Sequence, residues 1–112
     1  MNQYLLLFRR DVEFQLSPEQ LQKMTKPWMD WMGSIAAQNK LGERGNRLDW
    51  SGKVVKPNNV VTNGPYVEMK EAIGGYTMVK ANSLDEAVEL AKGCPILAVG
   101  GNVEVRPIVS VE

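Results

Sequence analysis

The chain has 112 residues, of which 44% are hydrophobic and 23% are charged, a composition typical of one globular domain with one core, spanning residues 1–112. Thirteen basic residues balance thirteen acidic ones, which argues against nucleic acid and against an anionic membrane surface as partners. The chain has no histidine and a single cysteine, Cys94, so it can form neither a histidine-based triad nor an intrachain disulfide, and we expect no metal site and no cofactor.

The first predicted element is a strand in the segment QYLLLFRR, residues 3–10. The apolar and aromatic run at residues 4–8 predicts a strand that is buried on both faces and central in its sheet. The same run is too short to cross a bilayer, and no signal-peptide pattern follows Met1. We therefore expect a cytoplasmic protein with no membrane partner.

A long helix is predicted next, with Ser17 as its N-cap and its end near Asn39. Pro27 lacks an N–H group and interrupts the helical pattern, so we expect either a kink or a restart with Thr25 as a cap. Steps of three and four residues define one stripe that should face the core, and it consists of Leu21, Met24, Trp28, Trp31 and Ile35.

The middle of the chain carries weaker signals. Between residues 41 and 62, short apolar pairs alternate with turn residues, which predicts a short strand near residues 44–50 and a small hairpin around residues 57–59. The segment GGYTMVKA, residues 74–81, predicts a clearer strand because it is rich in aromatic and other β-favouring residues.

A second helix and a last strand complete the predicted elements. Ser83 and Glu86 have the spacing of a capping box at the start of the helix, and Gly93 lies just past its end. Residues 102–112 alternate between apolar and polar types, which predicts a half-buried strand. Its apolar face should carry Val103, Val105, Val109 and Val111.

This order of elements predicts an α+β fold, namely a ferredoxin-like sandwich in which an antiparallel-rich sheet carries both helices on one face. The other face of the sheet would then have no cover within the chain. Because the first strand is apolar on both sides, that face would be an exposed hydrophobic patch in a monomer. We therefore expect a homodimer packed sheet to sheet.

The segment NGPYVEMKEAIGGY, residues 63–76, is the best candidate for a functional site. Gly64 and Pro65 are most simply explained as a turn. The amide of Asn63 can close that turn or orient a ligand, but it cannot act as a general base. Tyr66 and Tyr76 either pack as half-buried phenols or hold an aromatic or carbonyl ligand.

Charged side chains in the same segment allow a catalytic interpretation. The simpler interpretation is that these side chains form solvated charge pairs on the surface. Their position in a loop beside glycine and proline turns, however, favours a role in binding. A carboxylate partly desolvated against Tyr66 would have a raised pKa and could act as an acid or base. The candidate catalytic residues are therefore Glu68, Glu71 and Tyr66. The candidate ligand-binding residues are Asn63, Gly64, Pro65, Tyr66, Lys70, Tyr76 and Arg9.

Two further groups of residues have simpler explanations. Cys94 follows a helix C-terminus, whose partial negative charge raises a thiol pKa, so we interpret it as a small buried residue. Arg9, Arg44 and Arg106 could surround a cleft and bind a carboxylate, but solvated arginines are the simpler reading.

Three segments together resemble a known family: NGPYVEMKEAIGGY, then LDEAVELAKGCP, then VEVRPI near the end. They are similar to the YCII-related family, and specifically to its DGPF subgroup, and the similarity extends over almost the whole chain. The resemblance implies a dimeric α/β barrel. The residues that match the subgroup pattern are Gly64, Pro65, Glu68, Lys70, Glu71, Gly74, Gly75, Tyr76, Cys94 and Pro95.

Two positions depart from the subgroup pattern. Asn63 stands where the subgroup usually has aspartate, and Tyr66 stands where it has phenylalanine. In the wider family a histidine and aspartate pair has been proposed as catalytic, and some relatives act on chlorinated or hydroxylated aromatic compounds as lyases or dechlorinases. This chain has no histidine and lacks that aspartate, so the resemblance implies the fold and not this chemistry. DGPF proteins are often associated with extracytoplasmic-function sigma factors, which implies a regulatory or ligand-sensing setting.

Three functions follow as hypotheses. The first is a small dimeric ligand-binding or regulatory protein with a cleft near residues 63–71. The second is a cofactor-independent lyase or isomerase that acts on a small, possibly aromatic, metabolite with Glu68 or Glu71 as the acid or base. The third is a structural or interaction module in which residues 63–76 serve only as architecture. A carboxyl group buried in a cleft near Tyr66 would favour the second over the first.

Overall fold

The structure of the protein is a computed structural model that describes residues 1–11, 16–64 and 71–110. Its strands are β1 (Asn2–Asp11), β2 (Leu41–Glu43), β3 (Gly52–Lys56), β4 (Val60–Gly64), β5 (Glu71–Ala81) and β6 (Asn102–Pro107), and its α-helices are α1 (Pro18–Ala37) and α2 (Leu84–Ala91). Short 3₁₀ helices occupy Pro57–Asn59 and Pro95–Val99. Four strands form an antiparallel sheet in the order β2-β5-β1-β6, while β3 and β4 pair separately as a hairpin.

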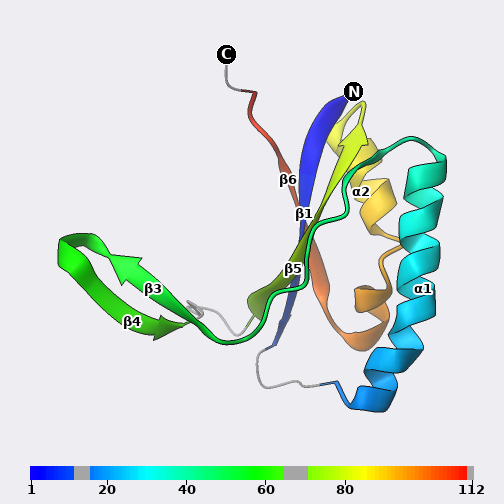
Figure 1. Cartoon of the computed structure of the whole chain (residues 1–112). Helices are drawn as coiled ribbons and strands as arrows, with labels where there is room; N and C mark the ends of the chain where they lie inside the picture. Colours follow the sequence, from blue (N-terminus) through cyan, green and yellow to red (C-terminus); the bar gives the residue numbers. More distant parts are fainter. Residues whose placement is uncertain (12–15, 65–70, 111–112) are drawn as a thin grey trace.

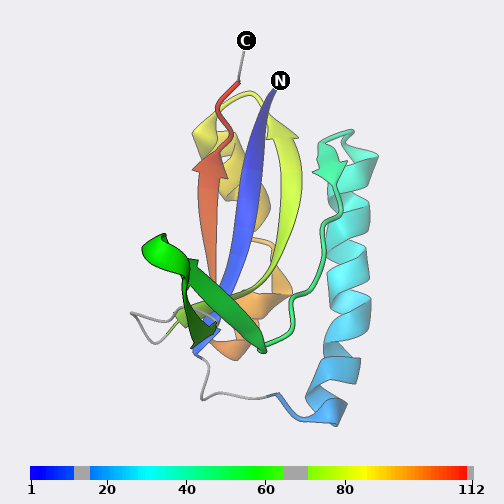
Figure 2. The ribbon, with the colours of Figure 1, turned by 60° about the vertical axis from the view of Figure 1, so that its left-hand side comes forward.

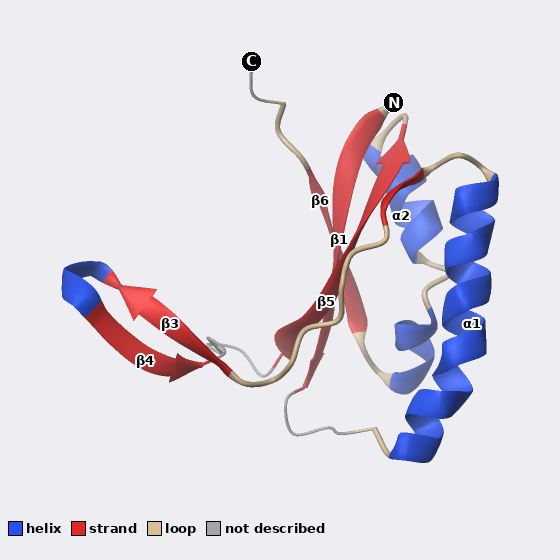
Figure 3. Cartoon of the chain, viewed as in Figure 1, coloured by secondary structure: helices blue, strands red, loops and turns tan. Residues whose placement is uncertain are grey.

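Both helices lie on the same face of the four-stranded sheet (Figures 1 and 3). The predicted ferredoxin-like α+β sandwich is therefore confirmed. Strand β1 lies between β5 and β6, as expected for the most apolar strand. Its side chains alternate, so that Tyr4, Leu6 and Phe8 are buried under the helices. The expected burial on both faces of β1 is wrong within one copy of the chain: Leu5 and Leu7 are only half-buried, because they point to the face that no helix covers.

Helix α1 begins as the sequence predicts. The Ser17 hydroxyl accepts a hydrogen bond from the Gln20 amide at 3.2 Å, and the Gln20 side chain accepts one from the Ser17 amide at 2.8 Å. The expected restart at Thr25 is wrong, because the helix runs unbroken through Pro27 and the Thr25 hydroxyl donates to the Leu21 carbonyl at 3.3 Å. Pro27 is exposed, so water can satisfy the carbonyl that it leaves without an N–H donor.

Three aromatic rings form the centre of the core between α1 and the sheet. Phe8, Trp28 and Trp31 meet edge to face, with ring centroids 5.0 to 6.0 Å apart. The indole N–H of Trp31 also donates to the Leu90 carbonyl at 2.9 Å and so joins α1 to α2. The largest fully buried side chains around this cluster are those of Leu6, Ile35, Val79 and Thr77.

The strand expected near residues 44–50 is wrong in its position and regularity. The regular strand β2 ends at Glu43, and the next residues follow the edge of β5 with a single isolated bridge, from Arg47 to Gly75. Gly45 has a φ of +76°, a left-handed conformation that interrupts the pleat of a strand. We call residues 44–50 the edge segment.

The remaining elements agree with the sequence except at the end of the chain. The hairpin turn contains Asn58 and Asn59 with positive φ angles, and the Ser83 hydroxyl caps α2 by accepting from the Glu86 amide at 3.1 Å. Strand β6 ends at Pro107, so Val109, which we expected on the apolar face, is 82% exposed. Val111 lies outside the described residues. No helix in the described ranges is both long and apolar enough to cross a bilayer.

Candidate ligand-binding site

The site residues expected between positions 63 and 71 are only partly described. Asn63 and Gly64 end strand β4, where they pair with Lys53 and Gly52 of β3, and the side chain of Asn63 is exposed. Glu71 begins β5, but its side chain lies outside the described part of the structure. Pro65, Tyr66, Glu68 and Lys70 also lie outside the described residues, so their roles stay predictions.

The structure places Arg9 in an ion pair on the uncovered face of the sheet. Its guanidinium donates to a carboxylate oxygen of Glu104 at 2.8 Å, and Arg106 donates to the other oxygen at 3.1 Å. These two arginines, Arg106 first and Arg9 second, lower the pKa of Glu104 below its ordinary value. Arg9 and Arg106 therefore share one carboxylate, that of Glu104, and they do not surround a cleft with Arg44.

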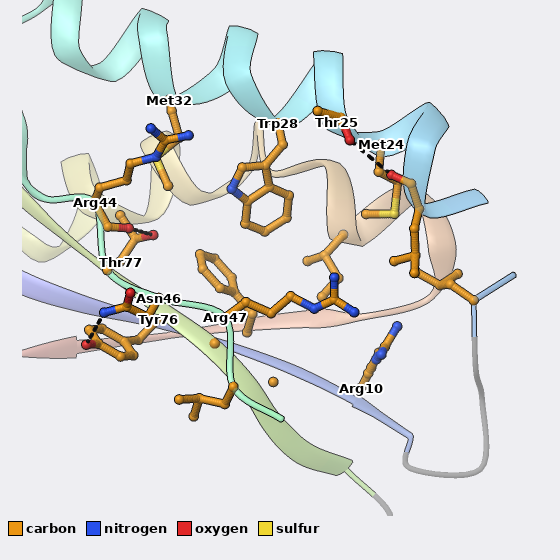
Figure 4. A pocket seen from close by; sticks show the side chains of 18 of the residues that line it. Arg10, Met24, Thr25, Trp28, Met32, Arg44, Asn46, Arg47, Tyr76 and Thr77 are labelled. Atoms are coloured by element: carbon orange, nitrogen blue, oxygen red, sulfur yellow. Dashed lines mark hydrogen bonds between the residues drawn. The ribbon is translucent and has the colours of Figure 1, made fainter. Parts of the chain in front are cut away.

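Tyr76 is the expected ligand-binding residue that lies beside a cavity, although its side chain, on the same face as that of its partner Leu7, belongs to the uncovered face of the sheet. Its hydroxyl accepts a hydrogen bond from the side-chain amide of Asn46 at 3.0 Å. The cavity has a volume of about 380 Å³ and lies between α1, β5 and the edge segment. This volume is within the range of small-molecule sites. Figure 4 shows Trp28 and Met32 reaching into it from α1, opposite Arg44 and Arg47 of the edge segment.

Apolar side chains make up the inner wall of the cavity. Trp28 and Phe8 form its floor, and both belong to the aromatic cluster of the core. Met24 and Met32 stand on the same face of α1 and border it from the helix side. Because methionine is flexible and polarisable, these two side chains can adapt to a flat apolar group placed against Trp28.

Three arginines stand at the rim. Arg10 lies two residues after the buried Phe8 on β1, so strand alternation turns it toward the helix side. Its guanidinium carbon is 5.0 Å from the ring centroid of Trp50, a cation–π contact. Arg44 and Arg47 are exposed and come from the edge segment. Within the described ranges none of the three forms a salt bridge with a carboxylate.

The positive charges at the rim repel one another. Burial lowers the pKa of Arg10, and the positive charge of Arg47 lowers it further, although the guanidinium stays charged at neutral pH. One acid of the edge segment, Asp49, interacts with these charges, and its carboxylate accepts hydrogen bonds from Ser51 and from the Trp50 amide, each at 2.8 Å. The Asp49 carboxylate stays ionised and attracts Arg47, so it offsets one of the three arginine charges, and these four groups together keep a net positive charge.

Two glycines explain how the edge segment reaches its position. A Cβ atom on Gly74 would lie 3.3 Å from the Trp50 ring, and one on Gly75 would lie 3.0 Å from the Asn46 carbonyl oxygen. The bare backbone of β5 therefore lets the edge segment lie directly on it. There the Tyr76 amide donates to the Asn46 carbonyl at 3.1 Å, and the Leu48 amide donates to the Gly74 carbonyl at 2.8 Å.

Sequence reasoning missed most of this cavity. We considered Arg44 as a carboxylate ligand, but not Arg10, Arg47 or Trp50, because they are far apart in the chain and match no motif. The Gly74–Gly75 pair was the available signal. A glycine pair inside a strand often marks the close approach of another backbone, and here that backbone carries two of the arginines.

Cys94 is buried, as predicted, and burial raises the pKa of its thiol to about 11. Relative to a thiol of pKa 9.0, the folded protein then has about 100-fold less thiolate near pH 8. We expect a thiol-specific disulfide reagent to label the native protein about that much more slowly than the protein unfolded in urea. Equal labelling rates in the two states would contradict this assignment.

The raised pKa of the Cys94 thiol also affects stability. Because the thiol loses its proton at a lower pH in the unfolded state than in the folded state, the free energy of unfolding should fall as the pH rises from 9 toward 11.

No group of acidic or cysteine side chains in the described ranges could hold a metal ion. A comparison with curated proteins finds no match. The sequence profile of the YCII-related domain family, in contrast, matches residues 3–112, which is almost the whole chain. The fold, with its two helices on one face of an antiparallel sheet, agrees with the α+β part of the expectation drawn from that resemblance, and the dimer stays a prediction. The chain belongs to the YCII-related domain family.

Proposed function

We propose that this protein binds a small organic anion with a flat apolar body, such as an aromatic carboxylate, in the cavity between α1 and the edge segment. One observation carries the proposal: three arginines without a carboxylate partner among the described residues stand around a cavity whose floor is aromatic. An anionic group at the rim would relieve the repulsion between Arg10 and Arg47. Its apolar body would contact Trp28 and the two methionines.

Guanidinium groups suit this ligand class. Their planar donors can bind both oxygens of a carboxylate, and a charge-assisted hydrogen bond of this kind contributes about 1.5 to 3 kcal/mol. The neutral chain as a whole offers no long-range attraction for anions, so the selectivity must come from the local charges at the rim.

The lining also favours binding over acid–base catalysis. The described residues around the cavity include no carboxylate, histidine or cysteine side chain. Their only oxygen-bearing side chains are the hydroxyl and amide groups of Thr25, Asn46, Tyr76 and Thr77. A lyase or isomerase that uses Glu68 or Glu71 with Tyr66 stays a second hypothesis, which rests on the sequence alone.

The assembly and the cellular role are proposed on other grounds. The uncovered sheet face carries the half-buried Leu5, Leu7, Tyr76 and Met78, and this supports a homodimer packed sheet to sheet. The resemblance to the DGPF subgroup supports a regulatory role with a functional link to an extracytoplasmic-function sigma factor, and the cytoplasmic location stays a prediction from the sequence.

The ligand class can be tested with paired probes. We expect 2-naphthoate to raise the melting temperature in a saturable manner and to bind in isothermal titration calorimetry, while the neutral 2-naphthamide does neither at equal concentration. Equal shifts with both probes would mean that the arginines do not select for charge. No shift with a series of carboxylates, from benzoate to naphthoate, would contradict the proposed function.

A pair of arginine variants connects the binding to the cavity. Arg47→Gln should weaken 2-naphthoate binding by about 10-fold or more, because it removes one charge-assisted contact. Arg106→Gln is the control, since it also removes an exposed positive charge, but from the opposite face of the sheet. If both variants weaken binding equally, the effect comes from net charge and not from the cavity.

A further inference from the structure

The β3–β4 hairpin, residues 52–64, stands away from the rest of the protein, and we call it the arm. Figures 1 and 2 show that it projects from the side of the sheet opposite the two helices. The radius of gyration is 15.4 Å, whereas a compact domain of this length has about 13 Å. The two strands of the arm pair with each other and not with the four-stranded sheet.

An arm of this kind is not expected to be stable by itself. A two-stranded hairpin in water is marginal unless one of its faces packs against something. Here Val55 and Val61 are direct partners across the hairpin, and their side chains are 74% and 54% exposed. Val60 at the turn end is 47% exposed. Cross-strand valines stabilise a hairpin best when they are covered, so this exposed pair indicates a surface that another molecule covers.

We propose that the arm packs against a second copy of this chain and clasps it. The arm and the uncovered sheet face are on the same side of the molecule (Figure 2). A copy seated on Leu5, Leu7 and Met78 of that face therefore lies next to the arm, and the two-fold symmetry of a homodimer gives each arm the same contact. The zero net charge of the chain allows two copies to approach without repulsion.

The arm thereby gives the homodimer a second contact region. The sheet face offers half-buried apolar side chains, and the arm adds the Val55–Val61 pair from outside that face. An interface that includes both would protect the arm from water in the dimer and expose it in the monomer. The clasp rests on the homodimer proposed above, so its test must separate the two.

The test compares one double variant in the arm with one single control variant by analytical ultracentrifugation. Val55→Asp/Val61→Asp should weaken the dimer at least about tenfold, because it places charges in an apolar contact. Leu97→Asp is the control, since Leu97 is an exposed apolar residue, 43% exposed, in the 3₁₀ helix Pro95–Val99 that packs against α1. Circular dichroism of each variant checks that the body of the protein is folded.

Each outcome supports or overturns either the homodimer or the clasp. A wild-type protein that is monomeric at all concentrations overturns the homodimer and the clasp with it. A wild-type dimer that the double substitution leaves unchanged overturns the clasp and leaves the homodimer standing. Hydrogen exchange provides a check without mutation: amides of residues 53–63 should become more protected as the concentration rises through the dimer dissociation constant. Exchange in the arm that does not depend on concentration also overturns the clasp. Neither result bears on 2-naphthoate binding by the cavity.

Discussion

A Gly45→Ala variant is expected to lose 2-naphthoate binding while it keeps the four-stranded sheet and both helices. Gly45 has a φ of +76°, and a Cβ atom there would collide with the carbonyl oxygen of Tyr76. The obstacle is backbone of a central part of the fold, so the edge segment must move instead. Its hydrogen bonds to β5 would break, and so would the bond at 2.9 Å in which the Thr77 hydroxyl donates to the Arg44 carbonyl. Arg44 and Arg47 would then leave the rim.

The loss of stability in this variant should be about 2 to 4 kcal/mol, the sum of backbone strain and about three hydrogen bonds. Urea denaturation measures it. Gly100→Ala is a matched control, because Gly100 has a φ of +86° but a Cβ there would meet nothing within 4 Å. Gly100→Ala places alanine in a left-handed conformation without a collision, so its loss of stability should be about 1 to 2 kcal/mol. A Gly45→Ala variant no less stable than Gly100→Ala, with normal binding, would show that the edge segment does not need glycine.

A Trp31→Ala variant should cost the most stability of any single substitution considered, about 3 to 5 kcal/mol. Trp31 is 7% exposed, meets both other rings of the aromatic cluster and donates its indole N–H to α2. Its removal leaves a cavity in the core and deprives the Leu90 carbonyl of this donor. Chemical denaturation followed by far-ultraviolet circular dichroism gives the free energy of unfolding.

Two substitutions on the same helix calibrate that result. Trp31→Phe keeps most of the ring contacts but loses the hydrogen bond, so it should cost about 1 to 2 kcal/mol. Met29→Ala removes a side chain that is 57% exposed and should change stability by no more than about 0.5 kcal/mol. A Trp31→Ala variant as stable as Met29→Ala would contradict the role of the aromatic cluster as the centre of the core.

The fold was predictable because its signals are local. The cap at Ser17, the continuous apolar run of β1 and the asparagine turn of the arm each specify an element within a few residues. Their order along the chain then limits the topology to few alternatives. The wrong predictions arose where a local pattern met a constraint from elsewhere. Residues 44–50 look like a strand, but the left-handed Gly45 and the approach to bare glycines on β5 make them irregular.

The candidate site was predictable only in part, for the same reason. Tyr76 was expected to contact a ligand and lies beside the cavity, but its side chain belongs to the uncovered face of the sheet, so the ligand contact stays a prediction. Arg10 and Arg47 belong to different elements, and only the pairing of β1, β5 and the edge segment brings them to one rim. No spacing rule in the sequence relates two arginines that are 37 positions apart. The family match over residues 3–112 supports the fold and leaves the ligand open to experiment.

The way in which the edge segment is attached has a consequence for how such a protein can diversify. Its two ladder-like contacts with β5 join main-chain atoms of Asn46, Leu48, Gly74 and Tyr76, so they do not depend on which side chains the segment carries. Substitutions at Arg44 or Arg47 can therefore change the chemistry of the rim without releasing the wall that displays it. Selection for a new ligand can therefore replace the side chains of the edge segment, while the glycines that allow its main-chain contacts stay constant.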